Sequence, residues 1–270
     1  MSHNYLDCIG EEEIDRLRAQ HEAWLPETHS VLMDSGFSGC SRIVEFGCGP
    51  GFSVFDLARL INPAAKVTAL DISDYYLNYI RKRIEEEGTT NIEVVQANAI
   101  DPLEFTQKFD AAFCRWFLAW VTKDIQQILT NINDSLKTGG TFVAMEYLTL
   151  RSTVHSPVCE TLPRYLEAWE TFYADAGGTT EIGAMLPELI KEAGFKIEEL
   201  RCVGGYSPVN QRLYNWWRRL YFEFREKFLE KGLMSSDEIN RMDLYWNQTV
   251  DREDSFIYSP VLLQVWATKC

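Results

Sequence analysis

Short apolar runs alternate with stretches of helical periodicity along the first half of the chain. Runs of strand length occur at 43–46, 66–71, 91–96, 109–114 and 141–147. Between the first two runs, residues 53–60 carry Val54, Leu57 and Ala58 at helical spacing, and a second helix is predicted over 73–87. Strands that alternate with helices predict an α/β protein with a doubly wound sheet.

Two aromatic insertions, 151–178 and 206–247, interrupt this alternation in the second half. A helix over 181–192 and a strand at 197–203 separate them, and a last strand is predicted at 259–267. One face of each insertion helix is strongly apolar, with Leu162, Tyr165, Leu166, Trp169, Phe172 and Tyr173 in the first and Leu213, Trp216, Trp217, Leu220, Phe224 and Phe228 in the second.

Two helices are predicted before the first strand. Residues 11–25 place Ile14 and Trp24 on one face, and Pro26 separates this helix from a short one that ends toward Gly36. Because both helices precede the first strand, they can lie over a ligand site. We therefore expect three parts, namely an N-terminal helical lid (1–39), a first α/β half (40–150) and a second half that contains the insertions (151–270).

A glycine-rich turn follows the first predicted strand. Glycine permits positive φ and a close approach of backbone to ligand, and the helix that follows offers free N–H donors. A dinucleotide-binding turn would require glycine at position 52, where this chain has Phe52. A turn without a ligand is the alternative. The spacing observed is Glu45-x-Gly47-x-Gly49-x-Gly51.

This spacing resembles motif I of the class I S-adenosylmethionine-dependent methyltransferases. The resemblance covers 40–150 well, and 180–203 and 258–268 more loosely. It implies a seven-stranded, mostly parallel sheet with an antiparallel last strand, S-adenosyl-L-methionine as cofactor in the first half, and an acceptor site in the second. The loop residues that it implies in cofactor binding are Glu45, Gly47, Cys48, Gly49 and Gly51.

Further cofactor residues are expected at the ends of the second and third strands. Asp71 lies twenty residues beyond Gly51, where a carboxylate can bind the ribose hydroxyls, with Ile72 beside it. Asp71 is alternatively an N-cap of the helix at 73–87. Asn98 and Ala99 occupy the place where the resembled family has an acidic and a small residue against the adenine. Asn98 departs from that pattern, but its amide oxygen can accept a hydrogen bond from the adenine amino group.

The fourth strand leads into Arg115 and Trp116. Arg115 is a candidate to orient the methionine carboxylate or a substrate acid, or else it pairs with a surface carboxylate. The Asn/Asp-Pro-Pro-aromatic motif of enzymes that methylate amino groups of nucleic-acid bases is absent here. Candidates for the lid and for the substrate wall, each with plain packing as the alternative, are Tyr5, Gln20, Trp24, Trp116, Trp169 and Trp216.

A sulfonium methyl group is already activated, so the protein mainly has to align a nucleophile and exclude water. A general base is needed only if the acceptor must lose a proton. Glu146, Tyr147 and His155 follow the fifth strand as weak candidates, although we expect His155 to be exposed to solvent. No Asp/Asn constellation predicts magnesium, and no His/Cys cluster predicts zinc.

The net charge of −14 over 270 residues opposes binding to nucleic acid and to anionic membranes. Seven cysteines without a paired pattern indicate reduced intracellular thiols, and no signal peptide or membrane span is visible. We therefore expect a cytoplasmic monomer or homodimer. The predicted function is methyl transfer from S-adenosylmethionine to oxygen or nitrogen of a small molecule. The alternatives are a non-catalytic S-adenosylmethionine-binding interaction module, a protein methyltransferase and an aminopropyltransferase-like enzyme.

Overall fold

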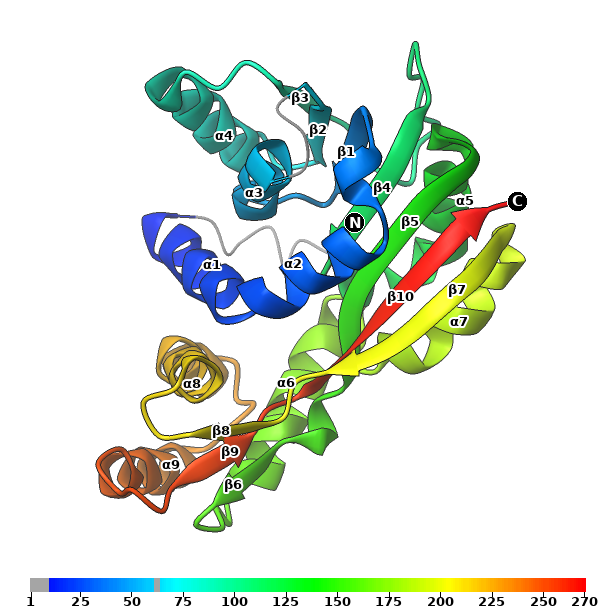
Figure 1. Cartoon of the computed structure of the whole chain (residues 1–270). Coiled ribbons are helices and arrows are strands. Elements are labelled where there is room, and N and C mark those ends of the chain that lie inside the picture. Colours follow the sequence, from blue (N-terminus) through cyan, green and yellow to red (C-terminus); the bar gives the residue numbers. More distant parts are fainter. Residues whose placement is uncertain (1–9, 61–63) are drawn as a thin grey trace.

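The computed structural model describes residues 10–60 and 64–270 (Figure 1). Its main sheet has seven strands in the order β3-β2-β1-β4-β5-β10-β7. Their bounds are β1 (Arg42–Phe46), β2 (Lys66–Asp71), β3 (Ile92–Gln96), β4 (Phe109–Arg115), β5 (Leu136–Thr149), β7 (Phe195–Val203) and β10 (Val261–Lys269). The first five strands pair in parallel, and β10 pairs antiparallel with both β5 and β7. The predicted seven-stranded sheet and its antiparallel last strand are confirmed.

Helices cover both faces of this sheet because side chains on a strand alternate between its faces. Ile43 belongs to one apolar cluster, with residues of α2 (Leu25–Asp34), α3 (Phe52–Leu60) and α4 (Asp74–Glu87). Its neighbour Val44 belongs to the other cluster, with residues of α5 (Ile125–Ser135) and α7 (Ile182–Glu192). The continuous apolar runs of the central strands therefore follow from burial on both sides.

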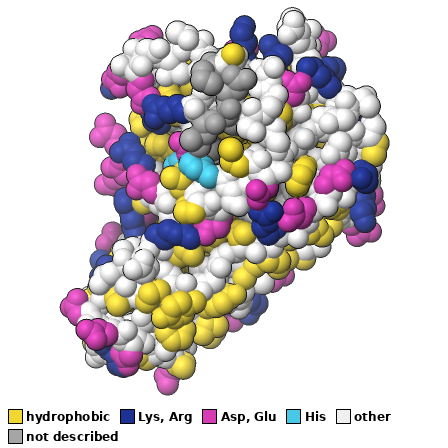
Figure 2. All heavy atoms as spheres, in the orientation of Figure 1, with side chains coloured by type: hydrophobic (Ala, Val, Ile, Leu, Met, Phe, Trp, Pro, Cys, Tyr) yellow, Lys and Arg dark blue, Asp and Glu magenta, His cyan; other side chains and the backbone are white. Residues whose placement is uncertain are grey.

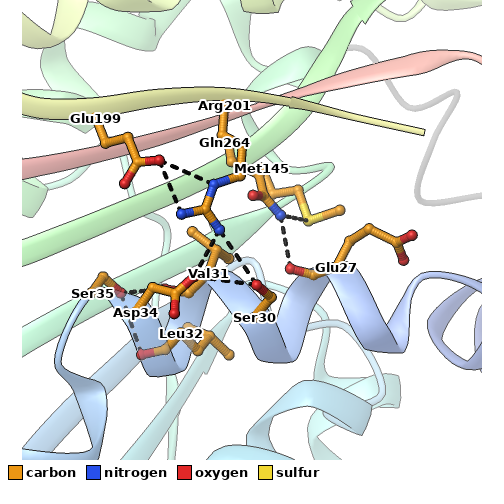
Figure 3. Close-up of polar contacts among 10 residues, drawn as sticks. All are labelled: Glu27, Ser30, Val31, Leu32, Asp34, Ser35, Met145, Glu199, Arg201 and Gln264. Atoms are coloured by element: carbon orange, nitrogen blue, oxygen red, sulfur yellow. Dashed lines mark hydrogen bonds and ion pairs between the residues drawn. The ribbon is translucent and has the colours of Figure 1, made fainter. Parts of the chain in front are cut away.

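Polar contacts fasten α2 to the sheet (Figure 3). Arg201 of β7 donates from Nη1 to Asp34 at 2.8 Å, and its Nη2 donates to Glu199 of the same strand at 2.9 Å. Gln264 of β10 donates from Nε2 to the carbonyl of Glu27 at 2.8 Å. Two strands thus hold the two ends of α2, which fixes this helix relative to the main sheet.

A second, three-stranded sheet has the order β6-β9-β8. It consists of β6 (Val154–Ser156), β8 (Tyr206–Pro208) and β9 (Phe256–Tyr258). The helices α6 (Leu162–Asp175), α8 (Arg212–Glu230) and α9 (Ser236–Thr249) surround it, and α1 (Glu11–Ala23) lies beside α8 (Figure 1). The sequence did not predict this sheet, because strands of three residues are too short to show a period.

Short 3₁₀ helices complete the described residues, at η1 (Phe37–Gly39), η2 (Leu118–Trp120), η3 (Thr122–Asp124) and η4 (Leu150–Ser152). Gly139, within β5, has a φ of 77°. Across residues 10–60 and 64–270, no helix has the length and apolar character that crossing a bilayer requires.

Candidate functional site

The glycine loop joins β1 to α3 and has positive φ at three glycines, 65° at Gly47, 51° at Gly49 and 75° at Gly51. A Cβ atom on Gly47 would collide with the ring of Phe117, and one on Gly51 would lie 2.7 Å from Ile80 Cδ1. A Cβ atom on Gly49 would meet no heavy atom within 4 Å. Packing therefore requires two of the glycines, whereas the third faces open space that a ligand can occupy.

Asp71 joins this loop to the end of β2. Its Oδ2 accepts a 2.8 Å hydrogen bond from the N–H of Gly49, and its Oδ1 accepts a 2.9 Å bond from the N–H of Ser73. Burial raises the pKa of Asp71, and these backbone donors act in the opposite direction. The carboxylate thus holds the start of α4 as well as the loop, and its remaining lone pairs can still accept from hydroxyl groups.

An apolar surface lies next to Asp71. Ile72 is 45% exposed, an unusual exposure for isoleucine. Its carbonyl accepts a 3.3 Å hydrogen bond from Gln96 at the end of β3. Asn98 Oδ1 accepts from the N–H of Ile100 at 3.2 Å, so the adenine contact expected of Asn98 would share this oxygen. Ala99 is buried beneath the same turn.

Glu45 lies at the base of the loop and is buried. Its Oε1 accepts a 2.5 Å hydrogen bond from Ser53 Oγ in the first turn of α3. Burial raises the pKa of Glu45 to about 8. Its Oε2 has no hydrogen-bond partner among the described residues, so this atom can accept a bond from a ligand.

Arg115 turns toward the N-terminal helices. It donates from Nη1 to Thr28 Oγ1 at 2.7 Å and lies with Nη2 3.0 Å from His21 Nδ1. His21 Nε2 in turn lies 2.9 Å from Asp56 Oδ2. Burial lowers the pKa of Arg115 to about 10. The guanidinium therefore ties β4 to α1 and α2, and the surface ion pair considered from the sequence is wrong.

A cavity begins at the glycine loop and extends under α1 and the second sheet's helices. Its loop side includes Gly47, Cys48 and Gly49. Its opposite side is mainly aromatic, and the residues that line it are Trp116, Trp120, Tyr147, Leu150, Trp169, Phe172, Tyr173, Trp217, Leu220 and Phe224. One cavity therefore connects the candidate cofactor loop to an apolar wall.

Trp116 lines this cavity from a left-handed backbone conformation, with a φ of 51°. Such a conformation costs on the order of 1–3 kcal/mol for a residue other than glycine. Its indole stacks on Trp216 at a centroid distance of 6.5 Å, and Trp24 packs edge-on against both rings. Trp24 and Trp216 are buried outside the cavity lining, so they support Trp116 from behind.

The three candidate bases have different surroundings. Glu146 is buried, and its Oε1 accepts 2.8 Å hydrogen bonds from the N–H groups of Phe117 and Leu118, so it holds the turn after β4. Burial raises its pKa to about 8. Tyr147 lines the cavity, and burial raises the pKa of its phenol. Of the three, it is the one in the cavity wall.

The expectation of an exposed His155 is wrong. Its side chain is 2% exposed, and its Nε2 accepts a 2.9 Å hydrogen bond from Trp217 Nε1. Burial lowers the pKa of His155 to about 3, which keeps the imidazole neutral near pH 7. Because His155 lies in β6 behind Trp217, it is separated from the cavity by that indole.

Of the other predicted residues, Gln20 and Trp169 line the cavity, and Tyr5 lies outside the described residues. The sequence did not single out Glu13 and Arg16, which line it from α1 together with Gln20. Their spacing of three and four residues places them on one face of the helix, a signal that was available. In the part of the chain that the structure describes, no group of three or more His, Cys, Asp or Glu side chains could hold a metal ion.

The site offers a ligand open space, a carboxylate and an apolar surface. Open space at Gly49, the Asp71 carboxylate and the exposed Ile72 lie at the carboxyl ends of β1 and β2, where ligands bind doubly wound sheets.

Comparison with known proteins supports this assignment. Residues 43–140 match a family model described as a methyltransferase domain. The demethylmenaquinone methyltransferase of Lactococcus lactis is 34% identical over 155 residues, which are 57% of this chain and 56% of that protein. This chain spans about half the length of the first curated relatives that it matches.

Solved structures share the fold. The phosphoethanolamine N-methyltransferase 2 of Haemonchus contortus, in complex with phosphomonomethylethanolamine and S-adenosylhomocysteine, has a TM-score of 0.51 and 17% identity, with 85% of this chain and 49% of that chain covered. The [4+2]-cyclase SpnF has a TM-score of 0.54 and 16% identity, with 85% and 74% covered. Residues 43–140 of this chain thus match a methyltransferase domain, and its fold is similar to that of solved methyltransferases in complex with S-adenosylmethionine or S-adenosylhomocysteine.

Proposed function

We propose that this protein transfers a methyl group from S-adenosylmethionine to an oxygen or nitrogen atom of a small molecule. One observation carries the proposal: the glycine loop and the aromatic wall line the same cavity. When bound, S-adenosylmethionine supplies a methyl group on a positively charged sulfur, which needs no further activation. The protein's task is then to align the acceptor and to exclude water.

The cofactor would be held by groups already described. Gly49 leaves space for the part of the cofactor that would lie against the loop backbone. Glu45 Oε2 can accept a hydrogen bond from an amino group of the cofactor. Asp71 would accept from the ribose hydroxyls, while Ile72, Ala99 and Asn98 would surround the adenine. Gly47, Cys48 and Gly51 would shape the loop, and Arg115 would act indirectly, by holding α1 and α2 in place.

A cover over the site would consist of α1 rather than the whole segment 1–39. Gln20 and three other side chains of α1 line the cavity, whereas β7 and β10 hold α2 to the sheet. In this proposal 40–150 binds the cofactor, and 151–270 supplies most of the acceptor wall. Trp116 and Tyr147 of the first half complete that wall, and together with Trp169 they would lie nearest the transferred group.

The acceptor is proposed as a small molecule for three reasons. The cavity wall is aromatic, as in sites for small ligands. The chain has a net charge of −14, which opposes binding to nucleic acid or to an anionic membrane. The Lactococcus relative is named for demethylmenaquinone rather than for a nucleic acid or a protein. The family match ends at residue 140, before the helices of the aromatic wall. We therefore do not assign demethylmenaquinone as the acceptor of this chain. Cytoplasmic location and a monomeric or homodimeric state stay predictions.

Two measurements test the proposal. Calorimetric titration with S-adenosylhomocysteine measures cofactor binding, and incubation with S-adenosylmethionine and a metabolite extract, followed by mass spectrometry, detects products heavier by one methyl group. Binding together with such a product is the expected result. Methylation of bulk RNA, DNA or protein instead of a metabolite would contradict the choice of acceptor.

A second candidate is a protein that uses this fold without methyl transfer. The similarity of the fold to a [4+2]-cyclase shows that related architectures are found in other enzymes. Binding of S-adenosylhomocysteine without any methylated product, across extracts from several sources, would favour this second candidate.

A further inference from the structure

A charged groove between α1 and α8 joins the cavity. The groove and the cavity share Glu13, Arg16 and Phe224 in their walls, so these residues form the neck between them. Figure 2 shows charged side chains of both signs gathered over the α1 side of the molecule. An acceptor that enters along this groove must pass the neck before it reaches the aromatic wall.

Glu13 and Arg16 form a closed pair at this neck. Arg16 donates from Nε and Nη2 to the two carboxylate oxygens of Glu13, at 2.8 and 2.6 Å, and from Nη1 to Gln20 Oε1 at 2.9 Å. Both side chains of the pair are only 11% exposed. An anionic acceptor would have to displace Glu13 from Arg16, which would strand a largely buried carboxylate.

The aromatic wall already holds positive groups of the chain. The guanidinium of Arg16 lies 5.5 Å from the centroid of Phe224, and Lys227 Nζ lies 5.4 Å from that of Phe172. Ring faces attract cations within about 6 Å of the centroid. Cations can thus approach these rings. Trp169 in the same wall offers an indole, which is a stronger partner of this kind, whereas the indole of Trp116 already has the Arg115 guanidinium 4.9 Å from its centroid.

Carboxylates outnumber cationic groups in the groove. Among the described residues that line it, the acidic ones are Glu11, Glu12, Glu13, Asp15 and Glu223, and the basic ones are Arg16, Arg219 and Lys227. A cleft with an excess of one sign raises the local concentration of ligands of the opposite sign. The net charge of −14 acts in the same direction at longer range.

We propose that the acceptor is an amine that is positively charged at neutral pH and carries an apolar body. The carboxylate-rich groove would admit it, the closed Glu13–Arg16 pair would stay intact, and the indole and phenyl rings would hold both the charge and the apolar body. This inference rests on the proposed methyltransferase function and narrows its acceptor. In the reaction the amine first gives one proton to solvent. Its nitrogen lone pair then forms the N–C bond while the S–C bond breaks, and the electron pair stays on sulfur.

The test uses three probes of nearly equal shape, 2-phenylethylamine, 2-phenylethanol and 3-phenylpropionate. Each is titrated calorimetrically into the full-length protein saturated with S-adenosylhomocysteine. We expect the amine to bind at least tenfold more tightly than the alcohol, and the carboxylate to bind most weakly. Equal or tighter binding of the carboxylate, equal binding of all three, or no binding of the amine would overturn the proposal.

Two variants on α1 provide a matched comparison. Glu13→Gln removes the carboxylate at the neck and should weaken amine binding at least fivefold, with little effect on the alcohol. Glu22→Gln makes the same change at an exposed position that lines neither the groove nor the cavity, and should leave all three affinities unchanged. Equal effects of the two variants on amine binding would overturn the assignment of the neck.

The affinity for S-adenosylhomocysteine is measured first and separately. If the protein has no affinity for S-adenosylhomocysteine, the probes are titrated into the protein alone. The expected ranking there would contradict the proposed function and leave the amine site standing. A protein that binds S-adenosylhomocysteine but binds the carboxylate most tightly would contradict the amine site and leave the proposed function standing.

Discussion

The N–H of Gly49 donates a 2.8 Å hydrogen bond to Oδ2 of Asp71. Through this bond, the loop after β1 and the carboxyl end of β2 form one unit, although 22 residues separate the two along the chain. Because Oδ1 of the same carboxylate accepts from Ser73, Asp71 orders the loop and the start of α4 at once. A ligand at this site meets a loop that is already in position.

Asp71→Ala should weaken binding of S-adenosylhomocysteine by about 1.5–3 kcal/mol, the range for a hydrogen bond to a charged group. Asp71→Asn should also weaken it, because both carboxylate oxygens accept from N–H groups and an amide nitrogen cannot. Calorimetric titration measures both effects. Wild-type affinity in both variants would reduce Asp71 to a structural cap.

Substitutions of the loop glycines should distinguish a glycine that packing requires from one that leaves space for a ligand. Gly49→Val should abolish binding of S-adenosylhomocysteine while the protein stays folded, because the added side chain enters open space. Gly47→Ala should instead lower the melting temperature, because its Cβ collides with Phe117. Both variants also carry the cost of positive φ, about 1–2 kcal/mol. Undiminished affinity in a folded Gly49→Val protein would contradict the assignment of the loop.

Alanine substitutions of Trp169 and Trp216 should lower the stability of the protein by similar amounts but should have different effects on its kinetics. Each substitution to alanine should lower the free energy of unfolding by about 3–5 kcal/mol, because both indoles are buried. Trp169→Ala alone should also raise the Michaelis constant for the acceptor, since Trp169 lines the cavity and Trp216 does not. Steady-state kinetics with the acceptor found by mass spectrometry decide the point. A larger kinetic effect from Trp216→Ala would contradict it.

Glu146 should make the protein less stable as the pH rises. Burial raises the pKa of Glu146 to about 8, well above the range of an unfolded carboxyl group. The folded state therefore binds this proton more tightly, and the free energy of unfolding should fall between about pH 5 and pH 8. Each unit of pKa difference corresponds to about 1.4 kcal/mol.

Glu146→Gln should flatten this fall, because the amide oxygen can keep the bonds from Phe117 and Leu118 without a charge. Denaturant unfolding from pH 5 to pH 9 measures the effect. Part of the fall should persist, because burial also raises the pKa of Glu45 to about 8. Parallel stability profiles for the two proteins would show that Glu146 is not the cause.

Cofactor binding should slow hydrogen exchange in α1 and leave α2 unchanged. Side chains of α1 line the cavity, whereas Asp34 and Glu27 of α2 are already bonded to the sheet (Figure 3). Exchange measured with and without S-adenosylhomocysteine tests this. Equal protection of both helices would mean that the whole N-terminal segment closes on the ligand.

The glycine loop and the order of the strands and helices of the main sheet were predictable from the sequence, because both depend on local patterns. Val44 and Ile43 point to opposite faces of the sheet, and helices cover both faces. Glycine at positions 47, 49 and 51 is typical of a loop with positive φ that lies close to a ligand. The resemblance that these residues carry supplied the antiparallel position of β10, which periodicity does not contain.

The roles of individual aromatic and acidic side chains were decided by tertiary structure. Trp24, Trp169 and Trp216 are three tryptophans on the apolar faces of predicted helices. Of the three, only Trp169 lines the cavity. His155 became buried because β6 pairs with β9, more than a hundred residues away in the chain. Local sequence determines which face of an element is apolar, but contacts between distant segments determine whether that face meets the core, a second helix or a ligand.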